Sequence, residues 1–232
     1  MNIMKSVCFS LLAFCIAFAA QGYDLNNKAL TPVTHKKAPN HAPVKLVENG
    51  ELRFAIAVED GAEFNRKAKK CFSRAANSLA HAFLLCTGKR PPVITTADAG
   101  KYQYVIYVGA SKEAHKAGID PMKLPEQGFI IQTFSKGVYI VGHDSSVDPN
   151  YKKEPLDFRE SSIGTFYAVC DFAERILGVR YYYPGKYGTY APAVKNLELK
   201  PFAYVDYPRF LARGFAWYMY VSFESDAMMK YW

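Results

Sequence analysis

Residues 161–192 carry the clearest secondary-structure pattern in the chain and read SSIGTFYAVCDFAERILGVRYYYPGKYGTYAP. The two serines at the start can cap a helix by accepting hydrogen bonds from its first free N–H groups. Gly178 can end that helix, because glycine adopts left-handed backbone angles without a steric penalty. Residues 179–183 then favour a strand, and a loop rich in Tyr, Gly and Pro follows. The apolar face of the helix, at offsets of 3, 4, 7, 10 and 11, consists of Phe166, Val169, Cys170, Ala173, Ile176 and Leu177.

A second, longer helix is predicted for residues 62–87. Its apolar residues repeat with helical spacing, which is typical of an amphipathic helix packed on a core. Five basic residues crowd its early part and favour a solvated face, with a face that binds anions or a partner as the alternative. The apolar residues are Phe64, Ala68, Cys71, Phe72, Ala75, Leu79, Ala82, Phe83 and Cys86, and the basic residues are Arg66, Lys67, Lys69, Lys70 and Arg74.

Shorter apolar segments predict the strands of a sheet that packs against these helices. Ser111 can cap a short helix over residues 112–117, and Gly137 can supply the positive φ of a tight hairpin. Residues 144–159 are polar and are expected to form a long loop. The order of elements predicts an α/β domain, an α+β sandwich whose mixed sheet carries both principal helices on one face. The predicted strands are residues 52–58, 93–95, 104–108, 129–134, 138–143, 179–183 and 197–199.

The N-terminal residues have the pattern of a secretion signal. A positively charged start precedes the apolar residues 6–20 and small residues that fit a cleavage site. This apolar run is shorter than the ~20 residues that a transmembrane helix needs, so a cleaved signal is favoured over a membrane anchor. Bulky Phe14 before Cys15 argues against a lipoprotein signal. We expect residues 1–22 to be a signal peptide, residues 23–43 an exposed linker, and the protein to be secreted or periplasmic without stable membrane insertion.

The chain is basic, with a formal net charge of +8. Its Lys and Arg residues are spread along the sequence and accompany no nucleic-acid-binding motif, so a solvated surface is favoured and no nucleic-acid partner is expected. Three cysteines follow the predicted signal: Cys71, Cys86 and Cys170. The first two are 15 residues apart on one predicted helix, hence ~22 Å apart. That distance excludes a disulfide between them, and all three are expected to be buried small side chains.

Motifs of several enzyme classes are missing from the sequence. There is no Cys-x-x-Cys, His-x-x-x-His or His-Glu-x-x-His spacing for zinc, no Gly-x-Ser-x-Gly elbow and no phosphate-binding glycine loop. A calcium-loop pattern that begins at Asp144 is interrupted by Pro149 and Pro155. We therefore expect no metal site and no cofactor.

The residues from Gly164 to Pro192 also resemble a known domain. They are similar to the closing helix–strand unit of the α/β domain that precedes the catalytic barrel in several glycoside hydrolases. The resemblance extends over residues 46–213. It points to the N-terminal domain of the α-glucuronidases of glycoside hydrolase family 67, to domain 2 of the β-hexosaminidases, and to a bacterial family of glycoside hydrolases catalogued as a domain of unknown function. It implies that residues 44–205 form an accessory domain beside a barrel that binds the carbohydrate substrate.

The last residues resemble the entry into such a barrel. The sequence DYPRF at 206–210, followed by Arg213 and Gly214, is similar to the first barrel strand of the β-hexosaminidases, where an arginine before a glycine contacts sugar hydroxyls. This resemblance makes Arg213 a candidate substrate-binding residue, with an interdomain ion pair as the alternative. The following FAWY lacks the Asp and Arg-His of that pattern, which leaves the sugar specificity open. Because a (β/α)8 barrel needs ~200–250 residues, residues 206–232 are expected to be its truncated start.

Glycoside hydrolysis usually employs two carboxyl groups ~5–9.5 Å apart. The candidate pairs in this chain fit turn, loop and helix-surface positions, so no catalytic residue is assigned and the chain alone is expected to be inactive. These pairs are Glu59/Asp60, Asp157/Glu160 and Asp171/Glu174.

The tyrosine-rich loop supplies a second kind of candidate. Tyr187 and Tyr190 can stack on sugar rings, because a tyrosine has an apolar face and a polar tip. The alternative is that the tyrosines pack in the sheet or against a barrel. The expected function is a non-catalytic N-terminal accessory domain of a secreted glycoside hydrolase that acts on polysaccharide or glycan. A stand-alone secreted module that binds carbohydrate or protein is the alternative.

Overall fold

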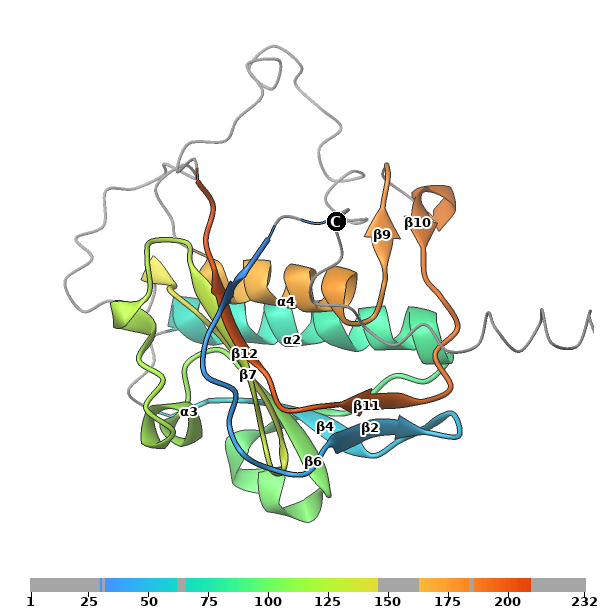
Figure 1. The fold of residues 1–232 in the computed structure, drawn as a ribbon, viewed down its shortest axis with the longest axis horizontal. Coiled ribbons are helices and arrows are strands. Elements are labelled where there is room, and N and C mark those ends of the chain that lie inside the picture. Colours follow the sequence, from blue (N-terminus) through green and yellow to red (C-terminus); the bar gives the residue numbers. More distant parts are fainter. Residues whose placement is uncertain (1–29, 31, 62–65, 146–162, 184–185, 210–232) are drawn as a thin grey trace, which may run out of the picture.

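The computed structural model describes residues 30, 32–61, 66–145, 163–183 and 186–209. The predicted signal peptide, most of the predicted loop at 144–159 and most of the predicted barrel start lie outside these residues. In the described part, a mixed seven-stranded sheet carries two long helices on one face (Figure 1), which confirms the predicted α/β class. In spatial order its strands are β1 (Thr34–His35), β12 (Ala203–Asp206), β7 (Phe129–Phe134), β8 (Gly137–Gly142), β6 (Tyr104–Val108), β4 (Phe54–Val58) and β5 (Val93–Thr95).

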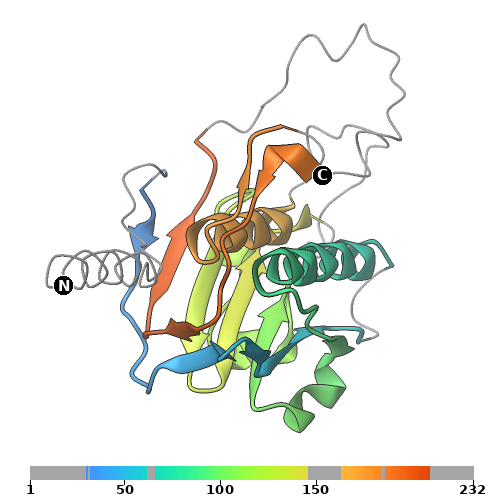
Figure 2. The same cartoon turned by 90° about the vertical axis from the view of Figure 1, so that its right-hand side faces the viewer.

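The sheet changes from parallel to antiparallel at β8. Strands β8, β6, β4 and β5 run parallel to one another, whereas β7, β12 and β1 each pair antiparallel. The long helix α2 (Arg66–Thr87) connects the parallel strands β4 and β5, and α4 (Gly164–Arg175) lies beside it (Figures 1 and 2). The opposite face packs against the 3-10 helix η1 (Thr96–Lys101) and the short helix α3 (Lys112–Lys116). Among the described residues, no helix combines the length and hydropathy needed to cross a bilayer.

The main core lies between the sheet and the helix pair. Phe83 of α2 contacts Phe54 of β4 with ring centroids 4.6 Å apart and Phe172 of α4 at 6.2 Å. All three side chains are almost fully buried. Burying an aromatic side chain of this kind stabilises the fold by about 2–3 kcal/mol. One aromatic contact therefore joins a strand to both principal helices.

Two small sheets flank the large one. The first is antiparallel and consists of β11 (Leu197–Leu199), β2 (Val44–Glu48) and β3 (Glu51–Leu52). The second pairs β9 (Arg180–Tyr181) with β10 (Thr189–Tyr190). The strand predicted for residues 179–183 is therefore shorter than expected and belongs to a separate hairpin. The remaining short element is the 3-10 helix η2 (Pro121–Lys123).

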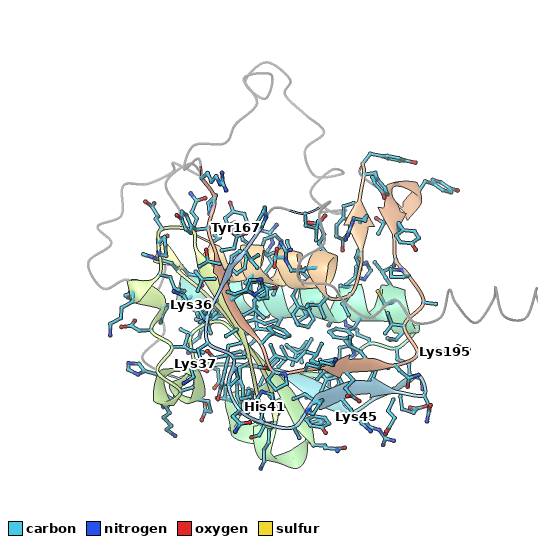
Figure 3. The ribbon with its side chains drawn as sticks, viewed as in Figure 1. Lys36, Lys37, His41, Lys45, Tyr167 and Lys195 are labelled. Carbon is cyan, nitrogen blue, oxygen red and sulfur yellow. The ribbon has the colours of Figure 1, made fainter. Side chains whose placement is uncertain are left out.

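The segment predicted as an exposed linker also contributes an edge strand. Residues 32–43 are largely exposed, yet Thr34 pairs with Val205, and the backbone N–H of Lys36 donates to the carbonyl of Ala203 at 2.8 Å. Figure 3 shows Lys36, Lys37 and His41 along this segment. The two pairing residues are too few for a periodic pattern, so only the partner strand reveals them.

The predicted β7–β8 hairpin is confirmed in detail. Gly137 has φ of 149°, and a Cβ atom placed there would lie 1.8 Å from the carbonyl oxygen of Val105. No side chain fits such a distance. This glycine lets β8 approach β6 closely, in addition to forming the turn.

Helix α4 differs from its prediction at two positions. Val169, Ala173 and Leu177 are buried as expected, but Cys170 is exposed rather than buried. Arg175, which follows the Asp171/Glu174 pair that the sequence places on the helix surface, is buried. Arg175 is buried because Tyr204 of β12, a strand that was not predicted, packs against its guanidinium.

The burial of Arg175 is compensated by a polar cluster between α4 and β12. Its guanidinium binds both carboxylate oxygens of Asp171, at 3.2 and 3.3 Å, and lies 5.9 Å from the ring centre of Tyr204. The Tyr204 hydroxyl donates to the same carboxylate at 2.8 Å. Burial and the Asp171 charge raise the pKa of Tyr204 well above its usual value, so this hydroxyl remains a donor.

Asp171→Ala should destabilise the domain by about 3 kcal/mol, because it removes the carboxylate that binds a buried guanidinium and a buried hydroxyl. Glu174→Ala, three residues further along the helix on its exposed side, should change stability by less than about 0.5 kcal/mol. Urea unfolding of both variants measures the difference. Equal effects would show that the cluster contributes little.

Candidate functional site

The tyrosine-rich loop forms a hairpin that projects beyond the helix layer (Figures 1 and 2). Strands β9 and β10 pair antiparallel, with Thr189 opposite Tyr181, and the short 3-10 helix η4 (Lys186–Gly188) lies between them. The backbone N–H of Tyr182 donates to the carbonyl of Gly188 at 2.8 Å. Residues 184–185 lie outside the described part.

The hairpin is attached to the C-terminal end of α4. Gly178 adopts φ of 76°, and the buried Val179 donates its N–H to the carbonyl of Ala173 at 3.0 Å. The Arg180 guanidinium donates to the carbonyl oxygens of Glu174 and Val179. A cation at this position also opposes the negative end of the helix dipole. The base of the hairpin is therefore fixed by backbone hydrogen bonds.

The tyrosine side chains of this hairpin are exposed to solvent. None of its tyrosines is buried in the sheet, so the structure does not support packing in the sheet as their role. Five aromatic side chains on one hairpin make an unusual surface, because large apolar groups rarely gather on the outside of a soluble domain. Their exposed fractions are 42% for Tyr181, 73% for Tyr182, 55% for Tyr183, 82% for Tyr187 and 56% for Tyr190.

Both candidate stacking residues, Tyr187 and Tyr190, belong to this exposed set. Tyr187 is in η4 and Tyr190 is in β10, so they come from adjacent parts of one small unit. A ring presented in this way can contact a flat apolar ligand surface and use its hydroxyl for hydrogen bonds. The other candidate, Arg213, lies outside the described residues.

The carboxyl ends of the parallel strands hold two buried carboxylates. Glu59 follows β4 and accepts hydrogen bonds from the Thr96 hydroxyl at 3.1 Å and from the N–H of Lys112 at 3.4 Å. It therefore helps to cap α3, next to the Ser111 hydroxyl that accepts from Ala114 as predicted. Glu59 was expected as a turn residue, and its bond from the Gly61 N–H, at 3.3 Å, agrees with that.

Asp144, two residues after β8, is fully buried and caps α4. It accepts a hydrogen bond from the Thr165 N–H at 3.1 Å and another from the Thr165 hydroxyl. The prediction that Asp144 belongs to a polar loop is therefore wrong for this residue. The sequence signal for a capping role was the position of this aspartate, directly after an apolar strand and before the helix. The serines at 161 and 162 are nearer to the start of that helix and were the more obvious candidates for its cap.

Burial raises the pKa of Asp144 to about 6, although its hydrogen bonds to Thr165 act in the opposite direction. The thiol of Cys71 lies 3.9 Å from the same carboxylate. Burial, followed by the Asp144 charge, raises the pKa of this thiol to about 12, so it remains protonated. This cluster joins α2, β8 and α4 and has no access to solvent at the carboxylate. Within the described ranges, no group of three or more His, Cys, Asp or Glu side chains could hold a metal ion.

No family model and no curated protein matches the chain, but solved structures do. The GH20 β-N-acetylhexosaminidase from Streptomyces coelicolor A3(2) is 17% identical, with a TM-score of 0.43, over 77% of this chain and 26% of that chain. The Streptomyces plicatus N-acetyl-β-hexosaminidase is 15% identical, with a TM-score of 0.40, over 78% and 28%. CpGH84D is 8% identical, with a TM-score of 0.44, over 84% and 26%.

The chain thus spans about a quarter of the length of the solved structures it matches. The hexosaminidases among them are glycoside hydrolases. All three TM-scores lie below 0.5.

Asp144→Asn should remove a pH-dependent part of the stability. The folded pKa of about 6 exceeds the usual 3.8, so between these values the folded protein binds more protons than the unfolded chain. Stability from this group is therefore present at low pH and falls as the pH rises. Relative to Asp144→Asn, the wild type should lose about 2 kcal/mol between pH 4 and pH 6.

Urea unfolding at several pH values measures this difference. Asp60→Asn, at an exposed aspartate near the same end of the sheet, is the control and should track the wild type at every pH. A difference between wild type and Asp144→Asn that is constant across the range would contradict the raised pKa.

Proposed function

We propose that this chain provides the N-terminal, non-catalytic accessory domain of a secreted glycoside hydrolase, and that the tyrosine hairpin is its contact surface for carbohydrate. The observation that carries the proposal is the exposure of Tyr187 and Tyr190 together with their three neighbours. Exposed aromatic surface of this kind is typical of a site that contacts a ligand or another domain.

Carbohydrate is the ligand class that suits these side chains best. A pyranose ring offers apolar C–H faces and a rim of hydroxyls, which match the ring face and the hydroxyl of tyrosine. Tyrosine also has few rotatable bonds, so ordering it on a ligand costs little conformational entropy. The bond from the Val179 N–H to Ala173 and the bond from the Arg180 guanidinium to the Val179 carbonyl hold the base of the hairpin in place before a ligand arrives.

A non-catalytic role is supported by what the buried carboxylates do. Glu59 and Asp144 are engaged as helix caps, and Asp171 binds Arg175 and Tyr204. A glycosidase needs one carboxyl group that can reach the glycosidic oxygen and a second one across the bond. We place that pair in a barrel that would follow the described domain, as the sequence resemblance implies, with Arg213 at its entry.

The polysaccharide is proposed from the same resemblance. Similarity to the α-glucuronidases favours a glycan that carries glucuronic acid, and similarity to the β-hexosaminidases favours one that carries N-acetylhexosamine. A stand-alone secreted carbohydrate-binding module is the second candidate, because the tyrosine hairpin would serve it equally well without a barrel.

The double variant Tyr187→Ala/Tyr190→Ala should bind polysaccharide about tenfold more weakly, since each stacked ring contributes about 0.5–1.5 kcal/mol. Native electrophoresis of the full chain in gels that contain glucuronoxylan or glycol chitin gives the measurement. Wild-type protein should be retarded in at least one gel, and the double variant should not.

Tyr207→Ala is the matched control, because Tyr207 is 50% exposed but lies outside the hairpin. It should migrate like the wild type. Retardation of the double variant equal to that of wild type, or no retardation of wild type in either gel, would exclude the hairpin as a carbohydrate surface.

A further inference from the structure

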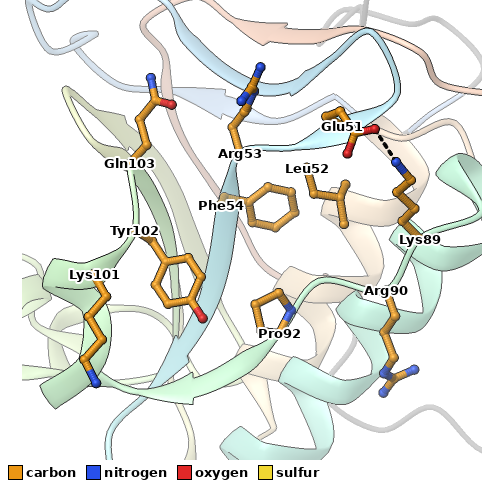
Figure 4. A pocket seen from close by; sticks show the side chains of 10 residues that line it. All are labelled: Glu51, Leu52, Arg53, Phe54, Lys89, Arg90, Pro92, Lys101, Tyr102 and Gln103. Carbon is orange, nitrogen blue, oxygen red and sulfur yellow. Dashed lines mark hydrogen bonds and ion pairs between the residues drawn. The ribbon is translucent and has the colours of Figure 1, made fainter.

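A pocket of about 430 Å³ lies at the amino ends of the parallel strands, away from the buried carboxylates at their carboxyl ends. Its walls come from β3, the start of β4, and the loops that lead into β5 and β6 (Figure 4). The volume is within the range of ~300–1,000 Å³ that is usual for small-molecule sites. Residues 51–54 meet here with two segments that follow about 35 and 50 residues later in the sequence.

The rim of this pocket is strongly basic. Four cationic side chains line it, from Arg53, Lys89, Arg90 and Lys101, against one carboxylate, Glu51. Lys89 binds Glu51 at 2.5 Å, and this hydrogen bond, followed by the charge of Lys89, lowers the pKa of Glu51. The carboxylate therefore stays ionised, and three cations remain in excess among the lining residues.

Two of these cations hold carboxylates from outside the pocket through solvent-exposed ion pairs. Arg53 binds Glu48 at 3.3 Å, and Lys101 binds Asp98 at 2.5 Å. Exposed pairs of this kind contribute about 0–1 kcal/mol, so an incoming anion can replace the carboxylate at little cost.

Arg90 also lines the pocket, but its guanidinium lies on the α2 side and points away from the Lys89 amine (Figure 4). Its guanidinium donates to the side-chain oxygen of Asn77 at 2.9 Å and to the Asn77 carbonyl at 3.4 Å, both neutral acceptors. Within the described part of the chain it forms no ion pair. A guanidinium can donate two parallel hydrogen bonds to a carboxylate or a sulfate.

The floor of the pocket is apolar and partly aromatic. Figure 4 shows the rings of Phe54 and Tyr102 with Leu52 and Pro92 between the charged groups. Phe54 belongs to the core, whereas Tyr102 is half-buried and presents part of its ring. An apolar floor with a cationic rim suits a ligand that has an apolar ring face and an acidic substituent.

We propose that this pocket binds an anionic sugar, a hexuronate or a sulfated hexose, with Tyr102 against the ring and the acidic group on the cationic rim. This inference rests on the proposed carbohydrate function and adds a second binding site to it. A carboxylate and a sulfate are both anions that accept hydrogen bonds from Lys and Arg, and the choice of probes distinguishes between them.

Titration calorimetry of the full chain with three tetrasaccharides tests the proposal. Hyaluronan tetrasaccharide carries carboxylates alone, chondroitin sulfate tetrasaccharide carries carboxylates and sulfates, and chitotetraose is neutral. At least one acidic probe should bind at least tenfold more tightly than chitotetraose. Equal binding of both acidic probes assigns the site to the carboxylate, and binding of the sulfated probe alone assigns it to sulfate.

The variant Lys89→Gln/Arg90→Gln should bind the acidic probe at least tenfold more weakly. Arg53→Gln/Lys101→Gln, on the other side of the rim, should also weaken binding and provides a second test if the first variant is unstable. Lys123→Gln is the matched control, since Lys123 is an exposed lysine paired with an aspartate elsewhere, and it should bind like the wild type.

The proposed binding site would be overturned if the chain showed no preference for the acidic probes, or if both pocket variants bound them like the wild type. So would an equal loss in Lys123→Gln, which would indicate attraction to overall charge. The variant Tyr187→Ala/Tyr190→Ala keeps the pocket intact and should retain the acidic preference. The pocket proposal could fail while the retardation of the chain by polysaccharide still depended on the tyrosines. That result would leave the proposed function intact.

Discussion

The contact of Phe83 with Phe54 on one side and Phe172 on the other is the interaction on which the arrangement of this domain depends. It places α2 on the sheet and α4 against α2, so the direction of α4 is set by packing that begins in β4. The surface hairpin follows α4 after only a few residues. The position of the tyrosines in space is therefore a consequence of this aromatic contact, although they are not part of the core.

Both ends of α4 are held by charged groups from other segments or from its own continuation. Asp144 accepts from the first turn, and the Arg180 guanidinium donates to a carbonyl of the last turn. Each charge is on the side that the helix dipole favours. Arg175 and Asp171 join the same helix to β12 through the ring and the hydroxyl of Tyr204. The ionisable residues around α4 thus serve its placement.

Much of the fold could be predicted from local sequence. The periodicity of α2, the strand Tyr104–Val108 and the turn at Gly137 depend on nearby residues, and the structure has them where expected. Strands β1, β2 and β12 were not predicted, because short strands acquire their identity from a partner that is distant in sequence. The roles of Asp144 and Arg175 were missed for the same reason. The local sequence pattern predicts that a polar residue is exposed to solvent. Whether it is in fact buried depends on tertiary packing.

The candidate site was predictable in composition but not in geometry. The sequence identified Tyr187 and Tyr190 as possible contacts, but only the hairpin shows that all five tyrosines face solvent. The basic pocket gave no sequence signal at all, because its cations come from separated segments. In the sequence, these Lys and Arg residues contribute only to the net positive charge of the chain.

The central claim is that this domain precedes a catalytic barrel in a secreted enzyme, and the intact mass of the native protein, isolated from the cells or medium in which it occurs, tests it most directly. The account predicts a mass well above the 26.1 kDa of the present sequence, because a barrel adds ~200–250 residues. A mass slightly below 26.1 kDa, matching loss of the signal peptide alone, would contradict it and leave a binding module that acts without a barrel.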